Sequence, residues 1–239
     1  DDPLLVILPE AATISSPKDR IGMVIRDARK LDDGNYYLPA LSIPYVGREI
    51  AHLNRRSFEE FWQVNYAKLL GDAKAKLLLR YGLQMETPNS QNMLIQLDRN
   101  LKPTGKIVFR DLSDAVFVEG VTQGLGFTVE LAKDIAVKFD PHTYVQPFWS
   151  NSSWRFDEAG KMSVSKTTLK KWGITHNAAY VETLARELGF DPQAVGITSH
   201  LNNEDNMADV YSFLNSPQGQ KLLEEYRNRN LKFVPQKAA

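Results

Sequence analysis

The sequence contains no cysteine, and this absence excludes a disulfide scaffold, a thiolate metal site and a cysteine nucleophile. Only 4 histidines are present, and none of them has the spacing of a zinc motif. The motifs Gly-x-x-x-x-Gly-Lys-Ser/Thr, Gly-x-Gly-x-x-Gly and Gly-x-Ser-x-Gly do not occur. A P-loop, a Rossmann dinucleotide site and the nucleophile elbow of a serine hydrolase are therefore not supported.

Excess charge and long apolar runs are missing as well. The 29 Lys and Arg residues balance 29 Asp and Glu residues, which argues against a nucleic acid partner. The longest apolar run, residues 4–8, has the length of a strand, whereas a membrane span needs about 20 residues. A chain of 239 residues with 43% hydrophobic content is long enough to bury a sizeable core. We expect a globular, cytoplasmic protein with no membrane partner.

Apolar runs separated by turn signals predict a first antiparallel hairpin near the N-terminus. Residues 21–25 have the composition of a strand, and residues 31–35 include a Gly and an Asn, which tolerate the positive φ of turns. The second arm is expected at residues 36–45. Pro39 and Pro44 interrupt that arm, which favours an edge strand or a bulge.

The clearest helix is predicted to begin after Ser57. Ser57 and Glu60 have the spacing of a capping box, and Gly82 is a plausible C-terminal stop about 24 residues later. A second hairpin is expected next, from a strand at residues 93–97 and a returning strand at residues 106–109. Polar residues would come directly before the first strand of this hairpin and directly after its second strand.

The second half of the chain is predicted to be mainly helical. An irregular aromatic stretch is expected at residues 141–160, after a helix at residues 127–139. Further helices are expected at residues 165–172, 177–188, 204–214 and 216–229. The predicted class is α+β, with an α+β core at residues 1–140 and a helical subdomain at residues 141–239.

A possible metal site lies on either side of the second predicted hairpin. Asn92 precedes its first strand and Asp111 follows its second, so an amide and a carboxylate would meet at one end. Mg²⁺ prefers such oxygen ligands and keeps waters and substrate phosphates in its shell, as in protein kinases. The alternative is that residues 89–92 only turn the chain, while Asp111 pairs with Arg110 or another neighbour.

The loop expected at residues 13–20 is a possible phosphate site. Ser15, Ser16, Lys18 and Arg20 provide hydroxyls and cations in one short connection, although a solvated turn has the same composition. Arg48, placed at the end of the expected strand, would be a further cation. An arginine at a strand end is otherwise solvated or paired with a carboxylate.

Three segments together resemble the siderophore synthetases that work independently of nonribosomal peptide synthetases, the aerobactin-synthetase family. Residues 12–20 resemble the family's Ser-x-Arg-Thr loop, and residues 36–48 resemble its Lys-Leu strand with a Thr-x-x-x-Arg element. Residues 81–92, followed by Arg110 and Asp111, resemble its Tyr-Gly-Ile…Glu-x-His-x-Gln-Asn…Arg-Asp segment. The third match is the most specific, and the three span a little under half of the chain.

The departures from the family pattern are equally specific. The family's lysine, threonine, glutamate and histidine fall at Tyr36 or Tyr37, Pro44, Thr87 and Asn89. Glu86 stands one place before the glutamate position. The positions that keep the family's residue are Arg48, Gln91, Asn92, Arg110 and Asp111. The chain also lacks the family's large N-terminal region, so the resemblance implies a divergent and partial synthetase.

The resemblance implies ATP and Mg²⁺ as cofactors and a palm-like ATP-binding core. A carboxylic acid would be activated as an acyl-adenylate and condensed with an amine or hydroxyl in siderophore biosynthesis. Ser15, Ser16, Lys18, Arg20, Arg48, Gln91 and Asn92 would bind the nucleotide. Glu86, Asn92 and Asp111 would hold the metal, Arg48 and Arg110 would act at the reacting centre, and Lys102 is a further candidate for the acid.

Two other functions remain open from the sequence. One is a kinase-like phosphotransferase with Asp111 on Mg²⁺, and the other is a degenerate domain that binds a small acid or a partner without catalysis. A homodimer or an association with the missing N-terminal region is also expected.

Overall fold

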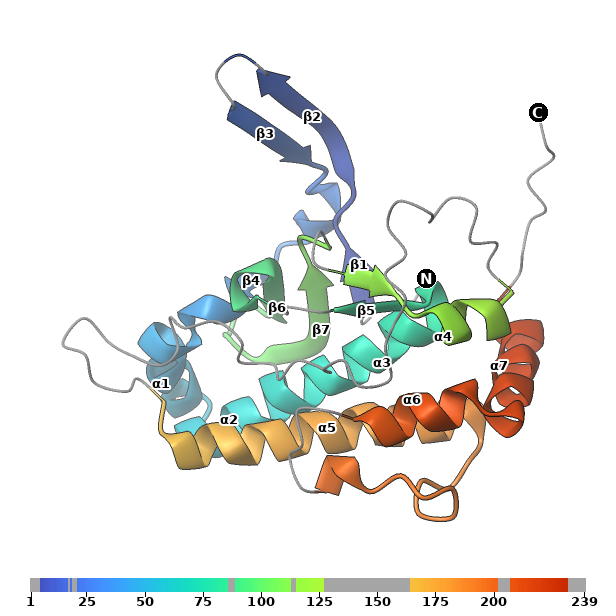
Figure 1. Cartoon of the computed structure of the whole chain (residues 1–239). Helices are drawn as coiled ribbons and strands as arrows, with labels where there is room; N and C mark the ends of the chain where they lie inside the picture. Colours follow the sequence, from blue (N-terminus) through green and yellow to red (C-terminus); the bar gives the residue numbers. More distant parts are fainter. Residues whose placement is uncertain are drawn as a thin grey trace.

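The computed structural model describes residues 5–16, 18, 21–85, 89–112, 115–126, 164–201 and 207–231. The architecture is α+β, as the sequence predicts (Figure 1). A small sheet lies against two long helical segments, and a two-stranded arm extends away from both. The expected helix at residues 127–139, the aromatic stretch at residues 141–160 and the domain boundary at residue 140 lie outside the described residues.

The central sheet has 4 strands in the order β1-β7-β6-β4. Its strands are β1 (Leu5–Ile7), β4 (Tyr36–Pro39), β6 (Met93–Leu97) and β7 (Pro103–Phe109). The predicted hairpin β6–β7 is confirmed, and its register pairs Met93 with Phe109. β1 lies parallel to β7 and β4 lies antiparallel to β6, so the hairpin forms the centre of the sheet.

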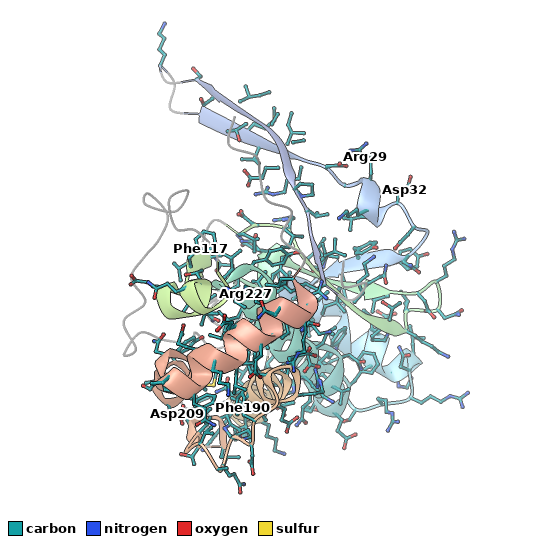
Figure 2. All side chains as sticks on the ribbon, turned by 90° about the vertical axis from the view of Figure 1, so that its right-hand side faces the viewer. Arg29, Asp32, Phe117, Phe190, Asp209 and Arg227 are labelled. Atoms are coloured by element: carbon teal, nitrogen blue, oxygen red, sulfur yellow. The ribbon has the colours of Figure 1, made fainter. Side chains whose placement is uncertain are left out.

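The arm is an antiparallel hairpin of β2 (Glu10–Ser16) and β3 (Ile21–Arg26). The prediction of a loop beginning at residue 13 is therefore wrong for residues 13–16, because these residues pair with β3. Alternation places Ile14, Met23 and Ile25 on one face of the arm, where their side chains are 54%, 55% and 42% exposed. Figure 2 shows the arm extending past Arg29 and Asp32, away from the helices.

The predicted strand at residues 36–45 is only partly correct. Its first four residues form β4, which pairs with β6 rather than with residues 21–25. The chain then turns through the short 3₁₀ helix η2 (Ala40–Ser42) into helix α1 (Ile43–Leu53). Pro44 is in the first turn of α1, where its missing N–H and fixed φ favour a helix. Ile43, Gly47, Ile50 and Ala51 are the buried face of α1.

The long helix expected after Ser57 is confirmed. It runs through α2 (Phe58–Trp62), a π-helical segment (Gln63–Lys68) and α3 (Leu69–Tyr81). The Ser57 hydroxyl accepts a hydrogen bond from the Glu60 N–H at 3.3 Å, which caps the N-terminus. Gly82 ends α3 in the left-handed conformation, with φ of 66°.

The second half of the described chain is mainly helical. Residues 165–172 and 177–188, expected as two helices, belong to the single helix α5 (Lys166–Leu188). The predicted last helix is confirmed as α7 (Pro217–Asn230), with the Ser216 hydroxyl accepting from the Gly219 N–H at 3.1 Å. The remaining elements are η1 (Arg29–Leu31), β5 (Leu83–Met85), η4 (Ser90–Asn92), β8 (Ala115–Phe117), α4 (Glu119–Gly124), η7 (Ser199–Leu201) and α6 (Ala208–Asn215).

Two large clusters of buried side chains form the core, and both span the halves of the chain. The first joins the inner face of the sheet to α1, α2 and the start of α5, including Trp62, Phe109 and Trp172. The second packs the later turns of α3 and α5 against α4, α6 and α7. α3 and α5 run through both clusters, so they connect the sheet to the helical end. Within the described residues, no helix is long and apolar enough to cross a membrane.

Candidate functional site at the open end of the β6–β7 hairpin

The open end of the β6–β7 hairpin brings together two of the predicted metal ligands. Asn92 ends η4 directly before β6, and Asp111 follows β7 by two residues. The Arg110 N–H donates a hydrogen bond to the Asn92 carbonyl oxygen at 2.8 Å, which extends the ladder by one step. Asn92 and Asp111 are therefore neighbours across the hairpin, as the sequence predicts.

Buried polar side chains lie at this end of the sheet. Asn92 is only 6% exposed. The hydroxyl of Ser90, two residues earlier in η4, is buried and has no hydrogen-bond partner within the described residues. Buried polar groups are normally satisfied, so this hydroxyl is an exception in the described part of the chain.

The carboxylate of Asp111 is held by an arginine from the arm. Nη2 of Arg26, at the end of β3, lies 3.2 Å from Asp111 Oδ2 and 3.1 Å from Glu10 Oε1. Arg26 Nε is buried without a hydrogen-bond partner in the described region. Sequence reasoning did not single out Arg26. The available signal was a cation directly after the apolar run at residues 21–25.

The other predicted nucleotide-binding residues lie elsewhere. Ser15 and Ser16 are in the last part of β2, paired with Gly22 and Ile21, and Lys18 is exposed in the turn of the arm. Figure 1 shows this part of the arm projecting away from the sheet. The structure therefore does not bring these side chains to the open end of β6–β7. Arg20 and Glu86 lie outside the described residues.

Arg48 is not at the end of a strand, because it belongs to helix α1. Its guanidinium carbon lies 4.6 Å from the centroid of the Phe58 ring, in a cation–π contact between α1 and α2. In Figure 1, α1 lies at the left of the molecule, whereas the arm extends upward from the sheet. Gln91 and Arg110 are both exposed beside Asn92 and Asp111, so these two remain within the site.

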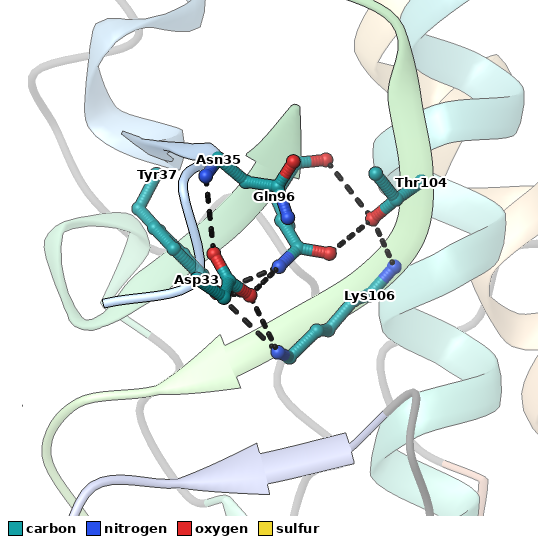
Figure 3. Close-up of polar contacts among 6 residues, drawn as sticks. All are labelled: Asp33, Asn35, Tyr37, Gln96, Thr104 and Lys106. Carbon is teal, nitrogen blue, oxygen red and sulfur yellow. Dashed lines mark hydrogen bonds and ion pairs between the residues drawn. The ribbon is translucent and has the colours of Figure 1, made fainter. Parts of the chain in front are cut away.

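A second polar cluster lies toward the closed end of the hairpin (Figure 3). Asp33 Oδ2 accepts hydrogen bonds from the Tyr37 hydroxyl at 2.7 Å and from Gln96 Nε2 at 2.6 Å. Nζ of Lys106 lies 3.5 Å from the same oxygen and 5.7 Å from the centroid of the Tyr37 ring. The resemblance places a lysine of siderophore synthetases at Tyr36 or Tyr37 of β4. Lys106 of β7 brings a cation beside Tyr37.

Asp111 and Asn92 are the residues at the open end that would hold a magnesium ion. Among the described residues, no group of three or more His, Cys, Asp or Glu side chains is arranged to hold a metal. Asp111 and Asn92 offer one carboxylate and one amide oxygen. This matches the usual magnesium site, in which one or two carboxylates are completed by waters and phosphates.

Comparison with known proteins adds one weak likeness to the α+β assignment. No protein family profile and no curated protein matches the chain. Among solved structures, it is similar to the crystal structure of the petrobactin biosynthesis protein AsbB from Bacillus anthracis str. Sterne, with 15% sequence identity and a TM-score of 0.38. The likeness covers 95% of this chain and 37% of that protein. At this TM-score the likeness carries no argument, so a function has to come from the chain's own residues.

Proposed function

We propose that the open end of the β6–β7 hairpin binds a magnesium nucleotide. The observation that carries the proposal is the placement of the buried Asn92 and the Asp111 carboxylate at the same open end of the hairpin. Protein kinases hold magnesium with an asparagine and an aspartate placed around a hairpin in the same order. The resemblance of residues 81–92, Arg110 and Asp111 to siderophore synthetases supports the same assignment.

The finer proposal is activation of a carboxylic acid for siderophore biosynthesis. When bound, Mg·ATP would supply the adenylyl group for the carboxylate and pyrophosphate as the leaving group. Asp111 and Asn92 would hold the metal, and the exposed Arg110 would attract the acid. An amine or hydroxyl would then take up the acyl group. The chain spans 37% of the length of the solved protein to which it is similar.

Thermal unfolding with and without Mg·ATP tests nucleotide binding. At 100 times the dissociation constant, a single site raises stability by about 2.7 kcal/mol. We expect Asp111→Asn and Asn92→Ala to lose this stabilisation. Asp32→Asn and Asn100→Ala are matched controls at exposed positions and should keep it. If Mg·ATP stabilises Asp111→Asn as strongly as the wild type, the site is not at this end of the hairpin.

Product analysis separates the two nucleotide-dependent reactions. A carboxylate-activating enzyme releases pyrophosphate and AMP and exchanges labelled pyrophosphate into ATP in the presence of its acid. A kinase-like phosphotransferase, which the Asn92–Asp111 pair would also serve, releases ADP. Nucleotide binding without either product would support a non-catalytic binding domain.

A further inference from the structure

A surface pocket of about 510 Å³ lies beside the closed end of the β6–β7 hairpin. It is at the opposite end of the hairpin from Asn92 and Asp111, because Lys102 and Pro103 lie at the turn between the strands. The C-terminal end of α1 and the first turns of the long helix form the other walls. The lining residues are Asn54, Arg56, Glu60, Phe61, Val64, Asn65, Lys102 and Pro103.

Three unusual stretches of backbone meet at this pocket. Arg55 and Leu101 have positive φ angles of 56° and 59°, and they are the non-glycine residues of the described chain in this conformation. The third is the π-helical segment Gln63–Lys68, which supplies Val64 and Asn65. Such backbone is energetically unfavourable and concentrates at functional sites. Arg55 and Leu101 flank lining residues of the pocket, since they adjoin Asn54, Arg56 and Lys102 in the sequence.

Hydrogen bonds within the walls leave the two asparagines as acceptors. Asn54 Nδ2 donates to the carbonyl oxygens of Ile50 at 2.9 Å and Leu101 at 3.0 Å, so it ties α1 to the hairpin turn. Asn65 Nδ2 donates to the Phe61 carbonyl oxygen at 2.8 Å. Within the described chain, neither Oδ1 atom accepts a hydrogen bond. Both Oδ1 atoms can therefore accept a hydrogen bond from a bound molecule, while Asn65 Nδ2 also keeps one N–H that can donate.

The charged side chains of the pocket divide into one acceptor and two donors. Glu60 offers a carboxylate, whereas Arg56 and Lys102 offer cations. None of these three side chains forms an ion pair with another described residue. Together with the asparagine oxygens, Glu60 suits an ammonium group, and the two cations suit a carboxylate. Phe61, Val64 and Pro103 provide apolar surface for the aliphatic part between them.

We propose that this pocket binds a small aliphatic zwitterion, with a primary amine at one end and a carboxylate at the other. The ammonium contacts Glu60 and the asparagine oxygens, and the carboxylate contacts Arg56 and Lys102. The volume is within the range of small-molecule sites, about 300–1,000 Å³. This pocket is separate from the proposed nucleotide site, so the proposal does not depend on nucleotide binding.

Titration of the folded chain with 5-aminopentanoate, followed by NMR without nucleotide, tests the proposal. We expect saturable shifts in the side-chain amide signals of Asn54 and Asn65, and no shift at Asn92. Pentylamine and pentanoate each lack one charged end, so each should bind about tenfold more weakly or worse. Equal binding by the three compounds, or no shift at Asn54 and Asn65, would overturn the proposal.

Substitutions assign the two ends of the ligand. Glu60→Gln should weaken binding of 5-aminopentanoate about tenfold while leaving the weak binding of pentanoate unchanged. Lys102→Gln should also weaken binding of 5-aminopentanoate, but it should leave the weak binding of pentylamine unchanged. Glu59→Gln and Lys68→Gln are matched controls, because both residues are exposed and lie outside the pocket. If Glu59→Gln weakens binding as much as Glu60→Gln, the effect is general electrostatics and the assignment fails.

Discussion

Asp33 is a partly exposed carboxylate whose ionised form is stabilised by its neighbours. Burial opposes its ionisation, but hydrogen bonds from the Tyr37 hydroxyl and the Asn35 N–H outweigh that effect. With the charge of Lys106 nearby, they lower the pKa of Asp33 to about 2. Burial of the Tyr37 side chain and its hydrogen bond to Asp33 raise the pKa of Tyr37. The cluster therefore requires an ionised Asp33 and a neutral Tyr37.

This cluster predicts an acid-sensitive contribution to stability. The pKa of Asp33 is lower in the folded state than the ordinary 3.8, so the contribution is complete above about pH 4 and is lost as the pH falls toward 2. Asp33→Asn should lower the free energy of unfolding at pH 7 by about 1–2 kcal/mol. Urea unfolding of both proteins from pH 7 to pH 2 measures the difference, which should shrink in acid. A constant difference would contradict the assignment, and Asp32→Asn is the control.

At the scale of elements, α3 and α5 approach each other closely at Gly71. A Cβ atom at Gly71 would lie within 3 Å of the His176 carbonyl oxygen of α5. Beside this contact, the Thr183 hydroxyl donates to Asp72 Oδ1 at 2.7 Å, and Gln63 Nε2 donates to the Thr175 hydroxyl at 2.7 Å. The absence of a side chain at residue 71 therefore sets the distance between the two helices that connect the cores.

Substitution of that glycine should separate the helices. Gly71→Ala places a methyl group against backbone rather than against a flexible side chain, so we expect a loss of about 1–3 kcal/mol. Gly22→Ala is a suitable control, because the nearest atom to its added Cβ is 3.8 Å away. Equilibrium unfolding in urea compares the two variants. Equal stabilities would show that α3 and α5 can adjust their spacing freely.

Local signals in the sequence predict helix ends and tight hairpins well, because the atoms involved are a few residues apart. The Ser57 cap, the Gly82 stop, the Ser216 cap and the β6–β7 hairpin are all confirmed. Asn92 and Asp111 also lie at the same end of the β6–β7 hairpin, as the positions of the two strands predict. These predictions needed no knowledge of the rest of the molecule.

Pairings between distant segments were harder to predict. The sequence predicts that residues 21–25 pair with residues 36–45, but they pair with β2 instead. The connection between β2 and β3, residues 17–20, is shorter than the connection between residues 25 and 36. Pro44 suggested an interrupted strand although it begins α1. Arg26 reaches Asp111 across 85 residues of sequence, and no local pattern indicates such a contact. Long-range contacts of this kind depend on the packed fold.

At the scale of the whole molecule, α3 carries a lysine inside the core. Lys74 is 1% exposed, and its burial lowers its pKa to about 7. His176 of α5 is buried as well; its burial and the charge of Lys74 both lower the pKa of its imidazole. Both groups are thus held toward their neutral forms where the two halves of the chain pack together.

Lys74 predicts a rise in stability with alkaline pH. Between pH 7 and the ordinary value of 10.5, the unfolded chain keeps the proton that the folded chain has released. The free energy of unfolding should therefore increase across this window, by up to about 1.4 kcal/mol per pH unit. Lys74→Met should remove the slope and raise stability at pH 7, whereas Lys68→Met at an exposed position should keep it. Urea unfolding from pH 6 to pH 10 measures both effects.

If Asp111 holds a divalent cation as proposed, its ion pair with Arg26 would make the arm a competitor of that cation. The apparent dissociation constant of the cation would then be its intrinsic value divided by the fraction of molecules in which Asp111 is released. Movement of the arm would change the metal affinity without contact with the metal. The strength of the ion pair between Arg26 and Asp111 would then set the metal concentration at which the cation displaces Arg26.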